Sequence, residues 1–135
     1  LSHLQLRSLK QGYDVHLENG LTIFNEEVTE KILEIRSYAY WSDTLFHSEY
    51  STYLSNITTL FHEATFLDDL KEKAQITYHS TAKEAGELAK LSNVKTLLLG
   101  HFSSRYASVL GHEAEAQQGF ARAFAVQEGK TYLVV

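Results

Sequence analysis

Four short polar segments in the middle of the chain hold the residue types of a metal-dependent hydrolase. Asp43 lies in Ser-Asp-Thr, Glu63 lies in His-Glu-Ala-Thr-Phe, and His79 begins His-Ser-Thr. The fourth segment, Gly-His-Phe-Ser-Ser-Arg-Tyr, carries His101 and Arg105. Each segment follows, or lies close to, a short apolar or β-rich stretch. We therefore expect each one to form a loop at the end of a core element, where functional residues concentrate.

Asp43 and His101 are the candidate metal ligands. A carboxylate and an imidazole suit zinc or manganese, and we expect both side chains at one edge of a sheet. The chain has no cysteine, so any metal has to be held by His, Asp and Glu. Taken alone, an Asp after a strand is more often a turn residue or a helix cap. A lone His in that place is more often a hydrogen-bonded structural residue, but the combination favours a metal site.

Glu63 and His79 form a candidate acid–base or relay pair that protonates a leaving group. Ser80 and Thr81 are first a helix cap, and the exposed N–H groups of a helix start also favour a bound phosphate. Arg105 either holds a phosphate bidentately or pairs with an acid, and both readings stay open. The other histidines have no ligand-like neighbours and are expected at the surface: His3, His16, His47 and His112.

Alternating strands and helices are predicted to position these segments. The range 82–91 is the clearest helix, because Thr81 and Glu84 form a capping box and leucine and alanine recur at helical spacing. The range 94–99 is almost purely apolar, as in a strand buried on both faces. Further strands are expected over 35–41 and 58–61.

The two ends of the chain are predicted to carry hairpins. Residues 13–17 alternate apolar and polar side chains and pair with 21–23 across a turn. The acidic segment 25–34 is expected to form a loop or a weak helical turn. A helix over 108–120 precedes a terminal hairpin of 121–126 with 131–135. This order predicts an α/β layered half-domain.

Composition narrows the classes of function. The chain has 135 residues, 44% of them hydrophobic, which suits one domain with a real core. Its net charge of −5 disfavours binding of nucleic acid over the whole surface. A phosphodiester substrate therefore needs local positive charge from metal ions or from a few Arg and Lys side chains. No apolar run reaches the ~18 residues of a membrane span. The chain starts at Leu1 and has no Met, so we expect an incomplete reading frame.

The four segments, in this order, resemble the second half of ribonuclease Z, the tRNA 3′-end endonuclease of the metallo-β-lactamase superfamily. The fullest matches are residues 60–66, 78–82 and 101–106. The resemblance covers nearly the whole chain and implies the C-terminal half of an αββα sandwich over residues 1–135. The family's main metal motif, His-x-His-x-Asp-His, occurs nowhere in the chain. We therefore expect the N-terminal half to be a required structural partner.

The resemblance also implies a role for each candidate residue. Asp43 is expected to bridge two zinc ions and His101 to bind one of them, with manganese as a possible substitute. His79 is expected to stabilise or protonate the leaving oxygen, with support from Glu63. Contacts with the substrate backbone are expected from three residues: Ser80, Thr81 and Arg105.

The implied function is zinc-dependent maturation of the 3′ end of precursor tRNA, by two-metal phosphodiester hydrolysis, in a cytoplasmic homodimer without a membrane. This half alone is expected to be inactive, because a catalytic zinc needs about three protein ligands and Asp43 and His101 supply two. It is also expected to expose an apolar sheet face. Two alternatives stay open: another phosphodiesterase of the same superfamily, and a non-catalytic half-domain that acts in dimerisation.

Overall fold

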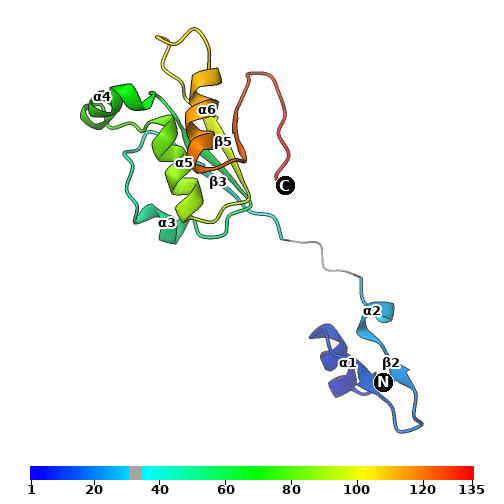
Figure 1. Cartoon of the computed structure of the whole chain (residues 1–135). Helices are drawn as coiled ribbons and strands as arrows, with labels where there is room; N and C mark the ends of the chain where they lie inside the picture. The colour runs from blue at the N-terminus through cyan, green and yellow to red at the C-terminus, as the bar shows by residue number, and fades with distance from the viewer. Residues whose placement is uncertain (31–34) are drawn as a thin grey trace. The chain divides into compact units, whose positions relative to one another are not determined.

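The computed structural model describes residues 1–30 and 35–135 of the chain. Contacts between Cα atoms divide the chain into two compact units, Leu1–Ile35 and Arg36–Val135 (Figure 1). All of the predicted site residues belong to the second unit.

The first unit contains helix α1 (His3–Lys10), strands β1 (Val15–His16) and β2 (Thr22–Ile23), and helix α2 (Asn25–Val28). The predicted N-terminal hairpin is confirmed, with β1 and β2 antiparallel. Helix α1 was not predicted, although Ser2 and Gln5 form a capping box at its start. Part of the acidic segment forms α2, and residues 31–34 of that segment lie outside the described residues.

The second unit is built on a four-stranded parallel sheet in the order β3-β4-β5-β6. The strands are β3 (Tyr38–Trp41), β4 (Thr59–Glu63), β5 (Thr96–Gly100) and β6 (Ala123–Ala125). Every residue of β5 is buried, as its apolar sequence predicted. The predicted α/β class is confirmed.

The predicted terminal hairpin is wrong. Strand β6 runs parallel to β5, with Leu97 beside Ala123, and residues 131–135 form no strand. The helical crossover before β6 returns the chain to the edge of the sheet at which β5 begins. The next strand therefore has to run in the same direction as β5. After β6 the chain does turn, but the backbone N–H of Gln127 donates to the Tyr132 hydroxyl instead of to a strand partner.

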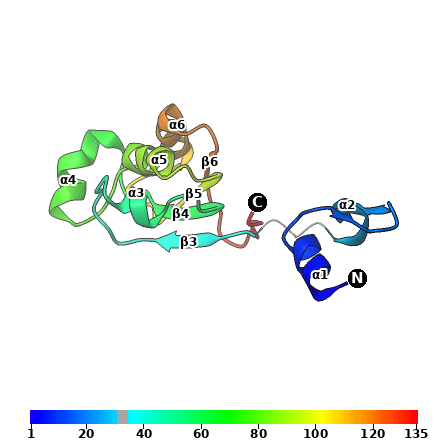
Figure 2. The same cartoon turned by 90° about the horizontal axis from the view of Figure 1, so that it is seen from below.

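Helices α5 (Ala82–Leu91) and α6 (Leu110–Gly119) cover one face of this sheet (Figure 2). Both predicted helices are confirmed, and Thr81 and Glu84 form the predicted capping box. Leu88 of α5 is buried in one core with Leu60 and Leu97 of the sheet. Three short helices were not predicted: α3 (Tyr50–Tyr53), η1 (Asp68–Leu70) and α4 (Lys71–Ile76).

The other face of the sheet carries a row of apolar side chains. Tyr40, Phe61, Leu98 and Phe124 are register neighbours across the four strands. The rings of Tyr40 and Phe61 stack with centroids 4.7 Å apart, yet Tyr40 is 64% exposed. No helix among the described residues is long and apolar enough to cross a bilayer.

Candidate metal and hydrolytic site

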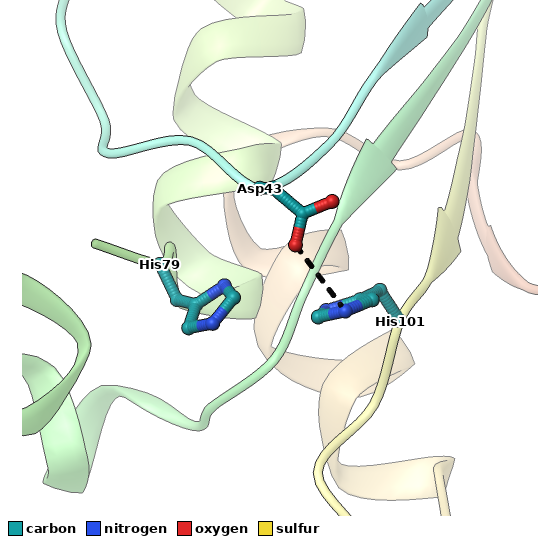
Figure 3. A group of neighbouring side chains, drawn as sticks. All are labelled: Asp43, His79 and His101. Carbon is teal, nitrogen blue, oxygen red and sulfur yellow. Dashed lines mark ion pairs between the residues drawn. The ribbon is translucent and has the colours of Figure 1, made fainter. Parts of the chain in front are cut away.

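Parallel strands bring three of the predicted site residues to one edge of the sheet. Glu63 is the last residue of β4, His101 directly follows β5, and Asp43 lies two residues after β3. The carboxyl ends of parallel strands are the usual place for a binding site in an α/β sheet. His79 reaches the same edge from the loop between α4 and α5 (Figure 3).

Asp43, His79 and His101 form a group that could hold a metal ion. One ligand atom from each residue lies within 4.8 Å of the others, and Asp43 Oδ1 is 3.5 Å from His101 Nε2. The side chain of Asp43 is 72% exposed and that of His101 is 43% exposed, so a substrate can reach the group. One carboxylate and two imidazoles are a donor set that fits zinc or manganese. Sequence reasoning placed His79 in catalysis only, whereas the structure also brings it within reach of a metal.

Unusual backbone conformations aim these side chains. Asp43 and His101 have positive φ angles of 52° and 56°, and Tyr78, just before His79, has a φ of 62°. Residues other than glycine rarely adopt this left-handed region, and holding one there costs on the order of 1–3 kcal/mol. Three such residues at one site are therefore maintained by the contacts around them.

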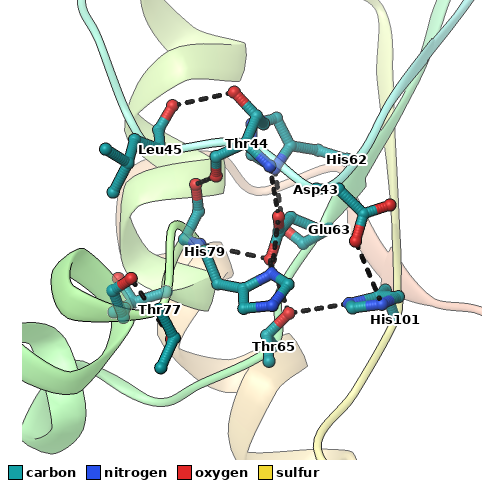
Figure 4. A network of polar contacts seen from close by, with 12 residues as sticks. Asp43, Thr44, Leu45, His62, Glu63, Thr65, Thr77, His79 and His101 are labelled. Atoms are coloured by element: carbon teal, nitrogen blue, oxygen red, sulfur yellow. Dashed lines mark hydrogen bonds and ion pairs between the residues drawn. The ribbon is translucent and has the colours of Figure 1, made fainter.

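Glu63 is the centre of those contacts, and its side chain is fully buried (Figure 4). Its carboxylate accepts hydrogen bonds from the backbone N–H groups of Thr44 and Ser80, at 2.7 and 3.1 Å, and from His79 Nδ1 at 3.0 Å. The Thr65 hydroxyl also donates to it. Burial by itself would raise the pKa of Glu63, but these hydrogen bonds outweigh it and lower the pKa below its ordinary value. Glu63 is therefore ionised at neutral pH.

The charge of Glu63 decides where the protons of both histidines lie. An ionised carboxylate only accepts hydrogen bonds, so the single proton of the Thr65 hydroxyl points to Glu63. That hydroxyl is also 2.8 Å from His101 Nδ1, and it has to accept there. The Nδ1 atom of His101 therefore carries a proton, and its Nε2 atom is the ring nitrogen that faces Asp43, at 3.5 Å. His79 Nδ1 contacts the Glu63 carboxylate, so Nε2 is the ring nitrogen of His79 that Glu63 does not engage.

Thr65 is thus a supporting residue that sequence reasoning missed. It lies within the His-Glu-Ala-Thr segment, and a hydroxyl two residues after Glu63 on an extended chain was the available signal. Residues around metal ligands commonly fix the tautomer and the orientation of a ligating histidine. The backbone of Thr65 also joins the loop after β4 to the loop after β5, because its carbonyl accepts a hydrogen bond from the N–H of Ser103 at 3.1 Å.

The three residues predicted to contact the substrate have different surroundings. Ser80 and Thr81 are fully buried. The Ser80 hydroxyl donates to the Thr44 carbonyl at 2.7 Å, and the Thr81 hydroxyl caps α5. Arg105 is exposed, lies over the Phe66 ring at 5.2 Å, and donates from Nε to Ser103. No carboxylate pairs with Arg105 in the part of the chain that the structure describes.

Two further histidines are buried beneath the site. His112 was expected at the surface, but it is fully buried between the rings of Phe102 and Tyr106, with centroid distances of 4.9 and 4.6 Å. That prediction is wrong because α6 turns this residue toward the loop after His101. Burial lowers the pKa of His112 and also that of the fully buried His62. His3, His16 and His47 are exposed, as predicted.

Comparisons with known proteins find sequence similarity to one enzyme family. Ribonuclease Z of Cytophaga hutchinsonii is 42% identical over 135 residues, which cover 99% of this chain and 43% of that protein. Ribonuclease Z of Porphyromonas gingivalis is 40% identical over 118 residues, or 87% of this chain and 39% of that protein. The chain spans less than half the length of these curated relatives and matches their C-terminal part, which confirms the predicted resemblance. No protein-family model matches the chain.

Solved structures agree with the predicted fold. The metallo-β-lactamase fold protein YhfI of Bacillus subtilis superimposes with a TM-score of 0.61 at 22% identity, over 67% of this chain and 36% of that one. The short form of human tRNase Z superimposes with a TM-score of 0.50 at 27% identity, over 63% of this chain and 27% of that one. The chain therefore has part of a metallo-β-lactamase fold, and the predicted fold is confirmed.

Proposed function

We propose that this chain is the C-terminal part of a ribonuclease Z, and that the complete protein is a metal-dependent endoribonuclease that matures the 3′ end of precursor tRNA. The observation that carries the proposal is the meeting of Asp43, His79 and His101 at one sheet edge, in a chain that is 42% identical to a relative of that name. Asp43 and His101 alone supply too few ligands for two metal ions. The remaining ligands belong, in this proposal, to an N-terminal half that carries a His-x-His-x-Asp-His motif.

Zinc is the proposed metal, and a bound pair of ions would supply Lewis acidity and a nucleophilic water at neutral pH. Asp43 would hold the two ions together through its carboxylate, and His101 would bind one of them through Nε2. The hydrogen bond from His101 Nδ1 to Thr65 supports this assignment, since it leaves Nε2 as the atom with a lone pair. Manganese suits the same donors.

His79 is the proposed proton donor for the leaving 3′-oxygen. The hydrogen bond between its Nδ1 atom and the Glu63 carboxylate holds the ring in place. A protonated His79 would give up the proton on Nε2, on the side of the metal ligands. Glu63 acts through His79 and through Thr65, without touching the reacting atoms.

Arg105 is the proposed contact with the RNA backbone. Its guanidinium has no acidic partner among the described residues, and its stacking on Phe66 holds it close to the loop of His101. This local positive charge suits a phosphate, although the whole chain has a net charge of −5. Phosphate contacts of Ser80 and Thr81 stay a prediction, as do the homodimer and the cytoplasmic location.

The proposal is tested by incubating the complete protein with precursor tRNA and with a small phosphodiester, in the presence of zinc. We expect cleavage at the 3′ end of the tRNA, loss of that cleavage in Asp43→Ala and His101→Ala, and a large loss in His79→Ala. Hydrolysis of the small phosphodiester without any cleavage of tRNA would instead support a different phosphodiesterase of the same superfamily. Full activity of Asp43→Ala would refute the proposed site.

A further inference from the structure

A cavity opens beside His79, and the hydrolytic chemistry does not require it. This side pocket has a volume of about 230 Å³ and is lined by Leu45, Phe46, His47, Gln75, His79 and Glu84. The volume corresponds to about eight water molecules at ~30 Å³ each. It is smaller than the ~300–1,000 Å³ of pockets for whole drug-sized ligands, so it suits a single ring system.

Hydrogen bonds to Glu63 and Ser80 fix the position of the side-pocket wall relative to the metal ligands. Its first residue, Leu45, follows Thr44, whose N–H donates to the Glu63 carboxylate at 2.7 Å. The carbonyl of Thr44 accepts from the Ser80 hydroxyl at 2.7 Å. The same buried carboxylate that orients His79 and His101 therefore also fixes the start of this wall.

Aromatic side chains make up much of the wall. Phe46 is half-buried against the core of the second unit. His47 is exposed, and its ring meets the Tyr50 ring edge-on at a centroid distance of 5.2 Å. Rings held in this way are the usual surfaces on which unpaired bases of RNA stack.

Polar side chains also line the cavity, and two of them have no hydrogen-bond partner among the described residues. The Gln75 side chain is exposed, and neither its amide nor the His47 ring nitrogens make a hydrogen bond to any described residue. The Glu84 carboxylate accepts from the Thr81 N–H and lies 3.4 Å from Lys71 Nζ. A side-chain amide, an imidazole and a carboxylate together offer the donors and acceptors that read the edge of a base.

We infer that the side pocket holds the base of the nucleotide whose 3′-oxygen leaves, an inference that rests on the proposed function. His79 connects the pocket with the reaction site, because it belongs both to the group that could hold a metal and to the lining of the pocket. A nucleotide that presents its 3′-oxygen to His79 Nε2 has its sugar beside this wall. Its base then lies against Phe46 and His47, with Gln75 at its edge.

The inference is tested on the complete protein with two RNAs, one unmodified precursor and one that lacks only the base just upstream of the cleaved bond. His47→Ala and Gln75→Ala change exposed side chains, so folding is retained. The matched controls are His3→Ala and Gln118→Ala, which are exposed residues far from the pocket in the sequence. Stacking of one base corresponds to about a 5- to 150-fold effect on the measured constant.

We expect His47→Ala to lower kcat/KM on the unmodified RNA at least fivefold, and Gln75→Ala to lower it in the same direction. On the abasic RNA both losses should shrink to less than twofold, because the pocket is already empty. Equal losses on both RNAs would overturn the inference while leaving the proposed function in place. A wild-type protein that cuts neither RNA would refute the proposed function and this inference with it.

Discussion

Replacing Thr65 with Val tests whether the Thr65 hydroxyl links His101 to Glu63, the carboxylate that also holds His79. Valine keeps the shape of threonine but removes Oγ1, which connects the Glu63 carboxylate to His101 Nδ1. Thr65 is only 6% exposed, so water does not easily replace the lost group. A hydrogen bond to a charged group contributes about 1.5–3 kcal/mol. We expect the free energy of unfolding to fall by about 1–3 kcal/mol, measured by urea denaturation of the complete protein.

The same substitution should weaken metal binding. Loss of a residue that orients a ligand typically lowers metal affinity about 10–100-fold, which is about 1.4–2.8 kcal/mol. Competition with a chromogenic chelator measures this change. Thr65→Ser is the matched control, since it retains the hydroxyl, and its metal affinity should stay within about threefold of the wild type.

Nitrogen NMR of the histidine rings gives a direct readout of the proposed tautomer. In the metal-free wild type, His101 should carry its proton on Nδ1, and in Thr65→Val the ring should become a mixture of both tautomers. If Thr65→Val leaves both the tautomer and the metal affinity unchanged, the hydroxyl does not orient His101 and the reasoning is refuted.

Three further predictions concern packing, pH and metal content. Gly86→Ala would place a Cβ 2.5 Å from the Ala116 carbonyl oxygen, so we expect a loss of about 1–3 kcal/mol in urea denaturation, whereas Gly119→Ala, with its nearest contact at 3.5 Å, should be close to neutral. Burial lowers the pKa of His62 and His112 below 6.5, so the unfolded chain binds more protons just below that pH and stability should fall as the pH drops from about 6.5. His112→Leu should reduce this slope by up to about 1.4 kcal/mol per pH unit, and an unchanged slope would contradict the assignment. The 135-residue chain produced alone should retain fewer than two zinc ions per chain after dialysis and should not cleave precursor tRNA, while two retained ions would show that this half suffices.

Local signals in the sequence predicted the elements with strong patterns. The capping box of Thr81 and Glu84 marked the start of α5, and the apolar run before His101 marked β5. The capping box of Ser2 and Gln5 was equally visible, but the polar residues around it concealed α1. The direction of β6 was not visible, because an alternating segment looks the same in a parallel or an antiparallel pair.

The residue types of the site could be predicted, but their geometry could not. The segments of Asp43, Glu63, His79 and His101 stand out in the sequence because polar residues follow apolar strands. The left-handed backbone of Asp43 and His101 gives no such signal, since neither residue is glycine. The burial of His112 depends on how α6 packs against the loop after His101, and that contact joins residues distant in the chain.

The zinc content of the complete protein tests the central claim most directly. We predict about two ions per chain in the wild type, the number that a two-metal hydrolase requires. Asp43→Ala should hold fewer ions and should lose cleavage of precursor tRNA. An Asp43→Ala protein with the same zinc content and the same activity as the wild type would contradict the assignment of this sheet edge as the metal site.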